Sequence, residues 1–447
     1  MIRGKTFIAL IIALVVLVGA ILAVNLLTPE ETVEDTTVTL FSMETSEASQ
    51  ISWTYDGETM HFMKLSDTWL YADDSSFPLD SSYIDAMLET LSQVTATRKL
   101  ENVGNLSEYG LDDPVCVINL QTDEKVEFAI GNLSAIGDSR YLSVGDGNVY
   151  LVDAAILNSF EYTLYDVVAK EELPAMTDVT RIQVVRQDNQ LDIQYLENSG
   201  LTYSNEFVWF LNQNGSYRAL DEELTEELLA GITELSWHTC ITHNADASAL
   251  EMYGLTDPAV TVSIDYLDEN GEGAVFGLEL GNVSGDYCYA KLTGSNMVYK
   301  IEGALRETLM YSTYHDLQPN DVLLMDWDVV TGVDVILDGV TYEIRQTEEG
   351  DNTVMMLDGT EAEITTIRNI LDSMDSAGFA DGAAPEQSMT IGFKFYRDAE
   401  TFQEVELVFY PFDSANCLAS LNGEARFYVS RERVTSLVQA ASAIVGA

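Results

Sequence analysis

The feature that most constrains this chain is a hexapeptide that occurs twice. Tyr109-Gly110-Leu111-Asp112-Asp113-Pro114 returns as Tyr253-Gly254-Leu255-Thr256-Asp257-Pro258. The two copies are separated by far more than one helix–turn unit, which indicates duplication of a domain-sized segment. The chain is therefore expected to form a row of similar domains.

The hexapeptide is typical of a helix end that leads directly into a strand. In the first copy, Leu106 opens a short helical turn that ends at Tyr109. Gly110 follows at the position where a left-handed backbone favours glycine, and Leu111 can contact Leu106 as in a Schellman ending. Pro114 prevents the helix from continuing and keeps Asp113 extended.

The second copy repeats these roles in the same order, with Leu250, Tyr253, Gly254, Leu255, Asp257 and Pro258. Two interpretations are open. The hexapeptide is either a fixed corner between helix and strand, or part of a ligand site built on Asp113 and Asp257. We favour the corner, because each position has a conformational reason for its residue type.

The sequence similarity extends beyond the corner on both sides. Upstream, Trp69 precedes Leu79-Asp80 as Trp209 precedes Leu220-Asp221. An amphipathic helix follows each pair, with apolar residues expected on one face: Ile84, Leu88 and Leu91 in the first, and Leu224, Leu228, Ile232 and Leu235 in the second. Downstream of each corner come β-hairpins, a Gly-Asn pair (Gly131-Asn132 and Gly281-Asn282) and a closing helix.

A third segment has the same succession of elements but lacks the hexapeptide. In it, Thr360 and Glu363 predict a capping box ahead of a helix. Helices and antiparallel hairpins within each segment favour the α+β class. We predict tandem repeated domains of antiparallel β-sheet packed with amphipathic helices, at residues 40–172 and 173–320, with a diverged third domain at 321–447.

The N-terminus predicts a membrane anchor. Residues 1–5 carry Arg3 and Lys5 and are expected to be a cytoplasmic stub. Residues 6–27 are apolar apart from Thr6 and Asn25 and are long enough for a transmembrane helix. Residues 28–39 form an acidic linker, after which the bulk of the chain is extracytoplasmic. A cleaved signal peptide is the alternative interpretation.

Charge restricts the classes of partner. The chain has 21 Lys+Arg against 74 Asp+Glu, a formal net charge of −53. Nucleic-acid binding is not expected, because it depends on basic residues that neutralise phosphates. Binding flat on an anionic lipid surface is disfavoured for the same reason. The charge indicates solvated faces, or a surface for cations or a basic partner.

The sequence offers candidates for a zinc site, a calcium site and a disulfide. His238, Cys240 and His243 are close in sequence, but on a strand they would not face the same side, as zinc requires. Asp326-Trp327-Asp328 and Asp265–Gly271 lack the spacing of an EF-hand calcium loop. A disulfide between Cys240 and Cys288 stays open at this point.

The sequence contains no Walker loop, nucleophile elbow or dinucleotide fingerprint. Carboxylate pairs are too abundant to single out a hydrolase site. We therefore predict no catalytic, cofactor-binding or metal-ligating residues, and no cofactor. We expect a protein that is not an enzyme.

The Tyr-Gly-Leu-x-Asp-Pro corner, with its preceding helix and its following strand, turn, strand and Gly-Asn, resembles the bacterial domain-of-unknown-function 4340 family. The resemblance covers residues 53–168 and 181–317 and, more weakly, the remainder. It implies one N-terminal membrane helix, an extracytoplasmic repeat region, and association with ABC-type export systems or gliding-motility-type components. It implies no catalytic residues.

The function expected from these observations is that of a membrane-anchored accessory or scaffold subunit, with integral-membrane or ABC-transporter partner proteins. A cell-wall or glycan-binding module is the first alternative. A hydrolase with an unrecognised carboxylate site is the second.

Overall fold

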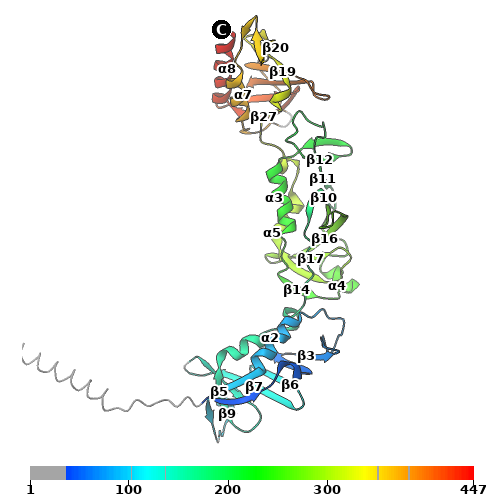
Figure 1. Cartoon of the computed structure of the whole chain (residues 1–447), viewed down its shortest axis with the longest axis vertical. Helices are drawn as coiled ribbons and strands as arrows, with labels where there is room; N and C mark the ends of the chain where they lie inside the picture. The colour runs from blue at the N-terminus through cyan, green and yellow to red at the C-terminus, as the bar shows by residue number, and fades with distance from the viewer. Residues whose placement is uncertain (1–36, 102, 136, 350–351, 381–382, 447) are drawn as a thin grey trace, which may run out of the picture. The chain divides into compact units, whose positions relative to one another are not determined.

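The described chain is mostly β, with three nine-stranded antiparallel sheets that follow one another in the sequence (Figure 1). The computed structural model describes residues 37–446, apart from 102, 136, 350–351 and 381–382. The chain divides into two compact units between Lys170 and Glu171. The first unit contains one sheet and the second contains two.

The first unit begins with an edge strand that precedes the repeated pattern. Its strands are β1 (Val38–Ser42), β2 (Gln50–Tyr55), β3 (Glu58–Leu65), β4 (Thr68–Tyr71), β5 (Gln93–Leu100), β6 (Cys116–Gln121), β7 (Lys125–Leu133), β8 (Ser139–Ser143) and β9 (Val149–Asp153). Its helices are α2 (Ser81–Ser92) and the 3₁₀ segments η1 (Thr45–Glu47), η2 (Leu106–Tyr109), η3 (Ala154–Phe160) and η4 (Leu164–Asp166). The Asp80 carboxylate caps α2 by accepting a hydrogen bond from the Ser82 amide.

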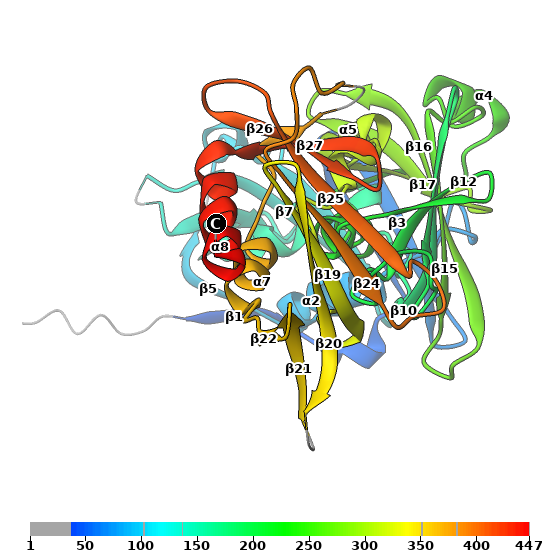
Figure 2. The same cartoon turned by 90° about the horizontal axis from the view of Figure 1, so that it is seen from above.

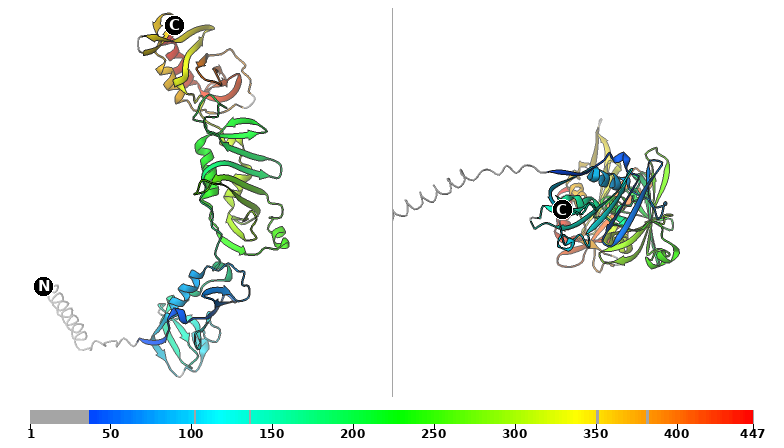
Figure 3. Two further views of the ribbon diagram at one scale, coloured as in Figure 1. Left: turned by 45° about the vertical axis from the view of Figure 1, so that its right-hand side comes forward. Right: turned by 90° about the horizontal axis from the view of Figure 1, so that it is seen from below.

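The second unit opens with a sheet whose two longest helices, α3 and α5, lie together on one of its faces (Figure 3). The strands are β10 (Thr177–Arg186), β11 (Gln190–Tyr195), β12 (Trp209–Gln213), β13 (Ser216–Ala219), β14 (Thr239–Thr242), β15 (Val260–Leu267), β16 (Gly273–Ser284), β17 (Tyr287–Leu292) and β18 (Val298–Glu302). The helices are α3 (Glu222–Thr233), α4 (Ala247–Met252), α5 (Gly303–Tyr311) and α6 (Tyr314–Leu317).

The third sheet completes the second unit, and its two helices lie against one face (Figure 2). Its strands are β19 (Val330–Leu337), β20 (Val340–Glu349), β21 (Asn352–Leu357), β22 (Thr360–Glu361), β23 (Gly378–Phe379), β24 (Ile391–Arg397), β25 (Glu404–Pro411), β26 (Asn416–Leu421) and β27 (Glu424–Ser430). The helical segments are η5 (Trp327–Val329), α7 (Thr365–Asp372) and α8 (Arg431–Val445).

The second and third sheets have the same topology. Their strand orders are β13-β12-β11-β10-β15-β16-β17-β18-β14 and β22-β21-β20-β19-β24-β25-β26-β27-β23. The first sheet, β1-β5-β9-β8-β7-β6-β2-β3-β4, follows this order but has β1 added at one edge and lacks a strand equivalent to β13 at the other. The third segment therefore has the repeated fold although it lacks the hexapeptide.

Helix faces follow the predicted pattern with two differences, of which the first is that α3 ends at Thr233 and leaves Leu235 beyond the helix. Ile84, Leu88 and Leu91 of α2 are buried, as the apolar spacing indicates. In α3, Leu228 and Ile232 are buried, whereas Leu224 is 38% exposed. The spacing places Leu224 on the predicted side of the helix, but the second sheet covers it only in part.

The hexapeptide forms a helix-ending corner in both copies. Gly254 has a left-handed backbone with φ of 70°, and Gly110 has φ of 68°. The Leu255 amide donates to the Leu250 carbonyl over 2.8 Å, and the Gly254 amide donates to Glu251 over 3.1 Å. These are the two hydrogen bonds of a Schellman ending.

The apolar contact of the corner differs between the copies. Leu255 is buried beside Ala245 and Val298, and Leu250 packs against this cluster. In the first copy Leu111 is buried, but Leu106 is 45% exposed. The apolar contact of the second corner is therefore better shielded from solvent than that of the first.

Each corner lies directly on the Gly-Asn pair of the neighbouring strand. A Cβ added at Gly281 would be 2.2 Å from the Tyr253 carbonyl oxygen, so only glycine fits there. The Asn282 amide donates to the same oxygen over 2.8 Å, and its side-chain nitrogen donates to the Met252 carbonyl over 3.0 Å. In the first unit, Gly131 lies equally close to the Tyr109 carbonyl oxygen.

One sequence prediction is wrong, and another lies outside the described residues. The capping box predicted at Thr360 is wrong: Thr360 lies in β22, and α7 begins at Thr365, whose amide and hydroxyl donate to Glu363. The predicted helix start was too early because Thr360 and Glu363 have the residue types of a capping box, although Thr360 belongs to a strand. The predicted transmembrane helix, residues 6–27, lies outside the described residues. Within the described part of the chain, no helix is long and apolar enough to cross a bilayer.

We predict that Gly281→Ala destabilises the second sheet by about 1–3 kcal/mol, the usual range for overpacking. The new methyl group would push against a backbone carbonyl that is fixed by the helix end. Gly273→Ala, in the same strand, is the matched control, because its Cβ meets nothing within 4 Å. Hydrogen exchange of β15 and β16 in denaturant measures both changes. Equal stability of the two variants would contradict the close contact between Gly281 and the Tyr253 carbonyl.

Candidate functional site

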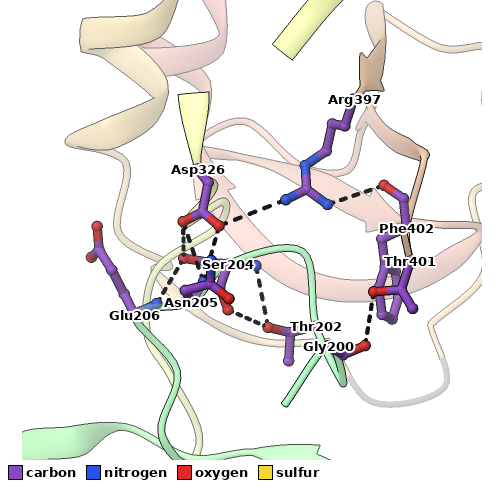
Figure 4. Close-up of polar contacts among 9 residues, drawn as sticks. All are labelled: Gly200, Thr202, Ser204, Asn205, Glu206, Asp326, Arg397, Thr401 and Phe402. Atoms are coloured by element: carbon purple, nitrogen blue, oxygen red, sulfur yellow. Dashed lines mark hydrogen bonds and ion pairs between the residues drawn. The ribbon is translucent and has the colours of Figure 1, made fainter. Parts of the chain in front are cut away.

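A long loop between β11 and β12 distinguishes the second sheet from the first. β11 ends at Tyr195 and β12 begins at Trp209, whereas only Ser66 and Asp67 separate the equivalent strands β3 and β4. The Leu196 amide donates to the Val208 carbonyl over 2.7 Å and closes the base of the loop. Residues 196–208, the junction loop, extend from there to the third sheet (Figure 4).

The junction loop contributes aromatic side chains to the core of the third sheet. Tyr203 and Phe207 are each only 9% exposed, and both belong to the apolar cluster that contains Phe393 and Phe409. The Tyr203 ring also lies edge-on to Phe402, with 6.2 Å between centroids. Burial raises the pKa of Tyr203 to about 12. Because the two sheets share a core here, they form one packed body.

A carboxylate fixes the backbone of the junction loop (Figure 4). The Asn205 amide donates to both oxygens of Asp326, over 3.2 and 3.1 Å, and the Ser204 hydroxyl donates to Oδ1 over 3.1 Å. At the far side of the loop, the Thr401 hydroxyl donates to the Gly200 carbonyl over 2.9 Å. Asp326, weighed above as a calcium ligand, instead binds protein groups.

Arg397 lies behind this carboxylate with its side chain only 4% exposed. One guanidinium nitrogen is 3.7 Å from Asp326 Oδ2, and another donates to the Phe402 carbonyl over 3.1 Å. Burial lowers the pKa of Arg397. Among the described residues, its buried Nε has no hydrogen-bond partner. A buried cation in this position depends strongly on the Asp326 charge.

A cavity of about 550 Å³ lies beside the junction loop, between the β13 edge of the second sheet and the β26–β27 hairpin of the third. Its apolar wall includes Tyr203, Phe207 and Phe427. Its polar lining includes Arg218 and Arg426, two of the 21 basic residues of the chain.

Tyr314 holds both arginines in place. The Arg218 guanidinium carbon lies 3.4 Å from the centroid of the Tyr314 ring, a cation–π contact. An Arg426 guanidinium nitrogen donates to the Tyr314 hydroxyl over 3.3 Å. On the same cavity wall, burial raises the pKa of Asp321, and the nearby Asp375 charge raises it further.

This arrangement is suited to binding. Guanidinium groups are donors for carboxylate, phosphate and polar hydroxyl groups, and the aromatic wall offers apolar contact. Arg218 and Arg426 were not identified from the sequence. Their only signal was basic character in a very acidic chain, and nothing in the sequence indicates that strands β13 and β27 line one cavity.

The predicted hexapeptide residues lie elsewhere. Those of the second copy, Leu250 to Pro258, are next to β14 and β18, at the opposite edge of the sheet from β13. Asp113 and Asp257 are both exposed. The sequence showed Asn132 and Asn282 but did not connect them to the corners, where Asn282 donates to the Met252 carbonyl and the Asn132 side chain lies against Gly110.

The histidine and cysteine residues considered from the sequence pack against other parts of the protein. The His238 ring stacks on Tyr287, with 4.3 Å between centroids. Cys288 is a free thiol, so the disulfide with Cys240 that the sequence left open is not formed. Burial raises the pKa of Cys288 to about 11 and that of Cys116 to about 12. Among the described residues, no cluster of three or more His, Cys, Asp or Glu side chains could hold a metal ion.

The family model described as Domain of unknown function (DUF4340) matches residues 69–206 and 209–394. The chain belongs to this family. Both matches begin at the paired tryptophans, Trp69 and Trp209, and the first ends within the junction loop. The second continues from β12 into β24, so the model for DUF4340 crosses from one sheet into the next. No curated protein and no solved structure matches the chain.

We predict that Asp326→Asn loosens the junction loop and costs about 1–3 kcal/mol, because charge-assisted hydrogen bonds are lost and Arg397 stays buried without its counter-charge. Limited proteolysis of the full chain should then show new cleavage within residues 196–208. Asp328→Asn, an exposed carboxylate in the same sequence motif, is the control and should leave the digestion pattern unchanged. Equal resistance of the Asp326 variant would show that the carboxylate does not hold the loop.

Proposed function

We propose that this DUF4340 protein is a non-enzymatic, extracytoplasmic accessory or scaffold subunit, anchored by the predicted helix at residues 6–27. Its partners would be integral-membrane proteins of an ABC-type export or gliding-motility-like envelope complex. The proposal combines the predicted anchor with what the resemblance to the family implies.

The observation that carries the proposal is the fusion of the second and third sheets into one body. Tyr203 and Phe207 of one repeat are part of the core of the next, and Asp326 fixes the loop that carries them. Repeats joined in this way hold their surfaces at a fixed spacing, which is the mechanical requirement of a scaffold.

The net charge of −53 supports a partner with basic surfaces. Complementary potentials accelerate association and suppress binding to like-charged surfaces. The same charge makes anionic lipid headgroups unfavourable neighbours.

A cell-wall or glycan-binding module is the second candidate, and the cavity beside the junction loop is the observation that favours it. Aromatic side chains next to Arg218 and Arg426 could contact the rings and acidic groups of a sugar polymer. This candidate requires a ligand in the cavity, whereas the scaffold does not.

The test is isolation of the tagged, full-length chain from its native membrane in a mild detergent, with cross-linking before extraction. We expect an integral-membrane partner to be recovered in fixed stoichiometry and to comigrate with the chain. A chain without residues 1–36 is the control for the anchor and should appear in the soluble fraction. Recovery of the intact chain alone in several detergents, together with sedimentation on peptidoglycan, would favour the glycan-binding candidate instead.

A further inference from the structure

The second sheet carries an open groove between its helices. The groove has a volume of about 680 Å³ and is lined by Leu224, Leu228 and Gly231 of α3, Leu305 and Thr308 of α5, and Leu317 of α6. Leu228 and Leu317 form a buried floor, whereas Leu224 is 38% exposed at the side. The groove is therefore an apolar channel in contact with solvent.

The equivalent helical segments of the first unit are joined by side-chain contacts. In that unit, Thr90 of α2 hydrogen-bonds to Ser159 of η3 over 2.7 Å. Tyr83 of α2 packs edge-on against Tyr162, with 4.9 Å between ring centroids. The polar contact joins α2 to η3, and the aromatic contact joins α2 to the short segment between η3 and η4.

Both closing residues are replaced in the second sheet. Counted from the capping residues Asp80 and Asp221, Gly231 takes the place of Thr90, and Leu224 takes the place of Tyr83. Glycine inside a helix costs roughly 0.5–1 kcal/mol relative to alanine. A Cβ at Gly231 would lie 3.6 Å from Leu305, an ordinary contact, so packing within the chain does not require glycine.

The third sheet also closes its helices against each other. There Arg433 of α8 donates to the carbonyl of Ser373, directly after α7. Among the described residues, these contacts join the helices of the first and third sheets, whereas an open groove lies between α3 and α5.

The edges of the groove are acidic. Glu227, Glu234 and Asp316 line it and are exposed, and no lysine or arginine is among the residues that line it. An apolar floor between acidic edges is complementary to a helix with one apolar face flanked by basic side chains. A second copy of this chain, with its charge of −53, does not match that pattern.

We propose that the α3–α5 groove binds a basic amphipathic helix of a partner protein. The apolar face of that helix would cover Leu224, Leu228 and Leu305, and its lysine or arginine side chains would pair with Glu227 and Glu234. The inference rests on the proposed scaffold function and specifies the surface through which one partner is held. Gly231 is the position that admits the apolar side chains of the partner.

The probe is a labelled amphipathic peptide built only from leucine and lysine, and its affinity for the full chain is measured by fluorescence anisotropy at physiological salt. Gly231→Phe fills the groove without changing charge and should weaken binding at least about tenfold, which corresponds to 1.4 kcal/mol. Gly273→Phe, placed in open space on β16, is its control and should have little effect.

Charge is tested with a matched pair of double variants. Glu227→Lys with Glu234→Lys should weaken binding at least about tenfold, whereas Glu269→Lys with Glu272→Lys, on the β15–β16 turn, makes the same change in net charge and should weaken it less than about twofold. Equal effects of the two pairs would show diffuse attraction to an acidic chain and would overturn the proposal.

Gly231→Leu is the second variant for the groove, in case phenylalanine disturbs folding, and circular dichroism verifies both. Full peptide affinity in a folded Gly231 variant would overturn the proposal. The two hypotheses fail separately. If the peptide binds the groove but no membrane partner is recovered from detergent, the site stands and the envelope-complex assignment falls. If a membrane partner is recovered and the Gly231→Phe variant still binds it, the groove is not the binding site, but the envelope-complex assignment stands.

Discussion

The structure of the second unit depends on burial of the junction loop in the core of the third sheet. Tyr203 and Phe207 lie within the third sheet's apolar cluster although they are encoded between two strands of the second. Two aromatic side chains at this depth exclude water from the contact, and the Asn205–Asp326 hydrogen bonds orient the backbone that presents them. Phe210 of β12, which is fully buried in the same cluster, and the Arg426–Tyr314 hydrogen bond add to this contact.

The corner and the shared topology have separate physical causes. The Schellman ending and its close contact with Gly281 fix where the helix stops and β15 begins. The third sheet reaches the same strand order without that device. The alternation of apolar residues along its strands, with Phe393 and Phe395 buried, is therefore sufficient for the topology, and the corner refines the local geometry.

Local features could be predicted from the sequence, and features that join distant segments could not. Gly110 and Gly254 occupy the left-handed positions expected for them, because a helix end is determined by neighbouring residues. The amphipathic spacing of α3 was correct for Leu228 and Ile232, yet Leu235 lies beyond the helix end, and the exposure of Leu224 depends on which residues lie opposite it. Arg218 and Arg426 both contact Tyr314 only because two sheets pack together, and a single sequence carries no record of that arrangement.

Hydrogen exchange of the intact chain is the most direct test of the central claim, that the second and third sheets form one body through the junction loop. We expect the amides of residues 196–208, and that of Asn205 in particular, to exchange as slowly as those of β24. Exchange as fast as that of the exposed Asp338-Gly339 turn would contradict it, because a loop that opens freely cannot hold two sheets together.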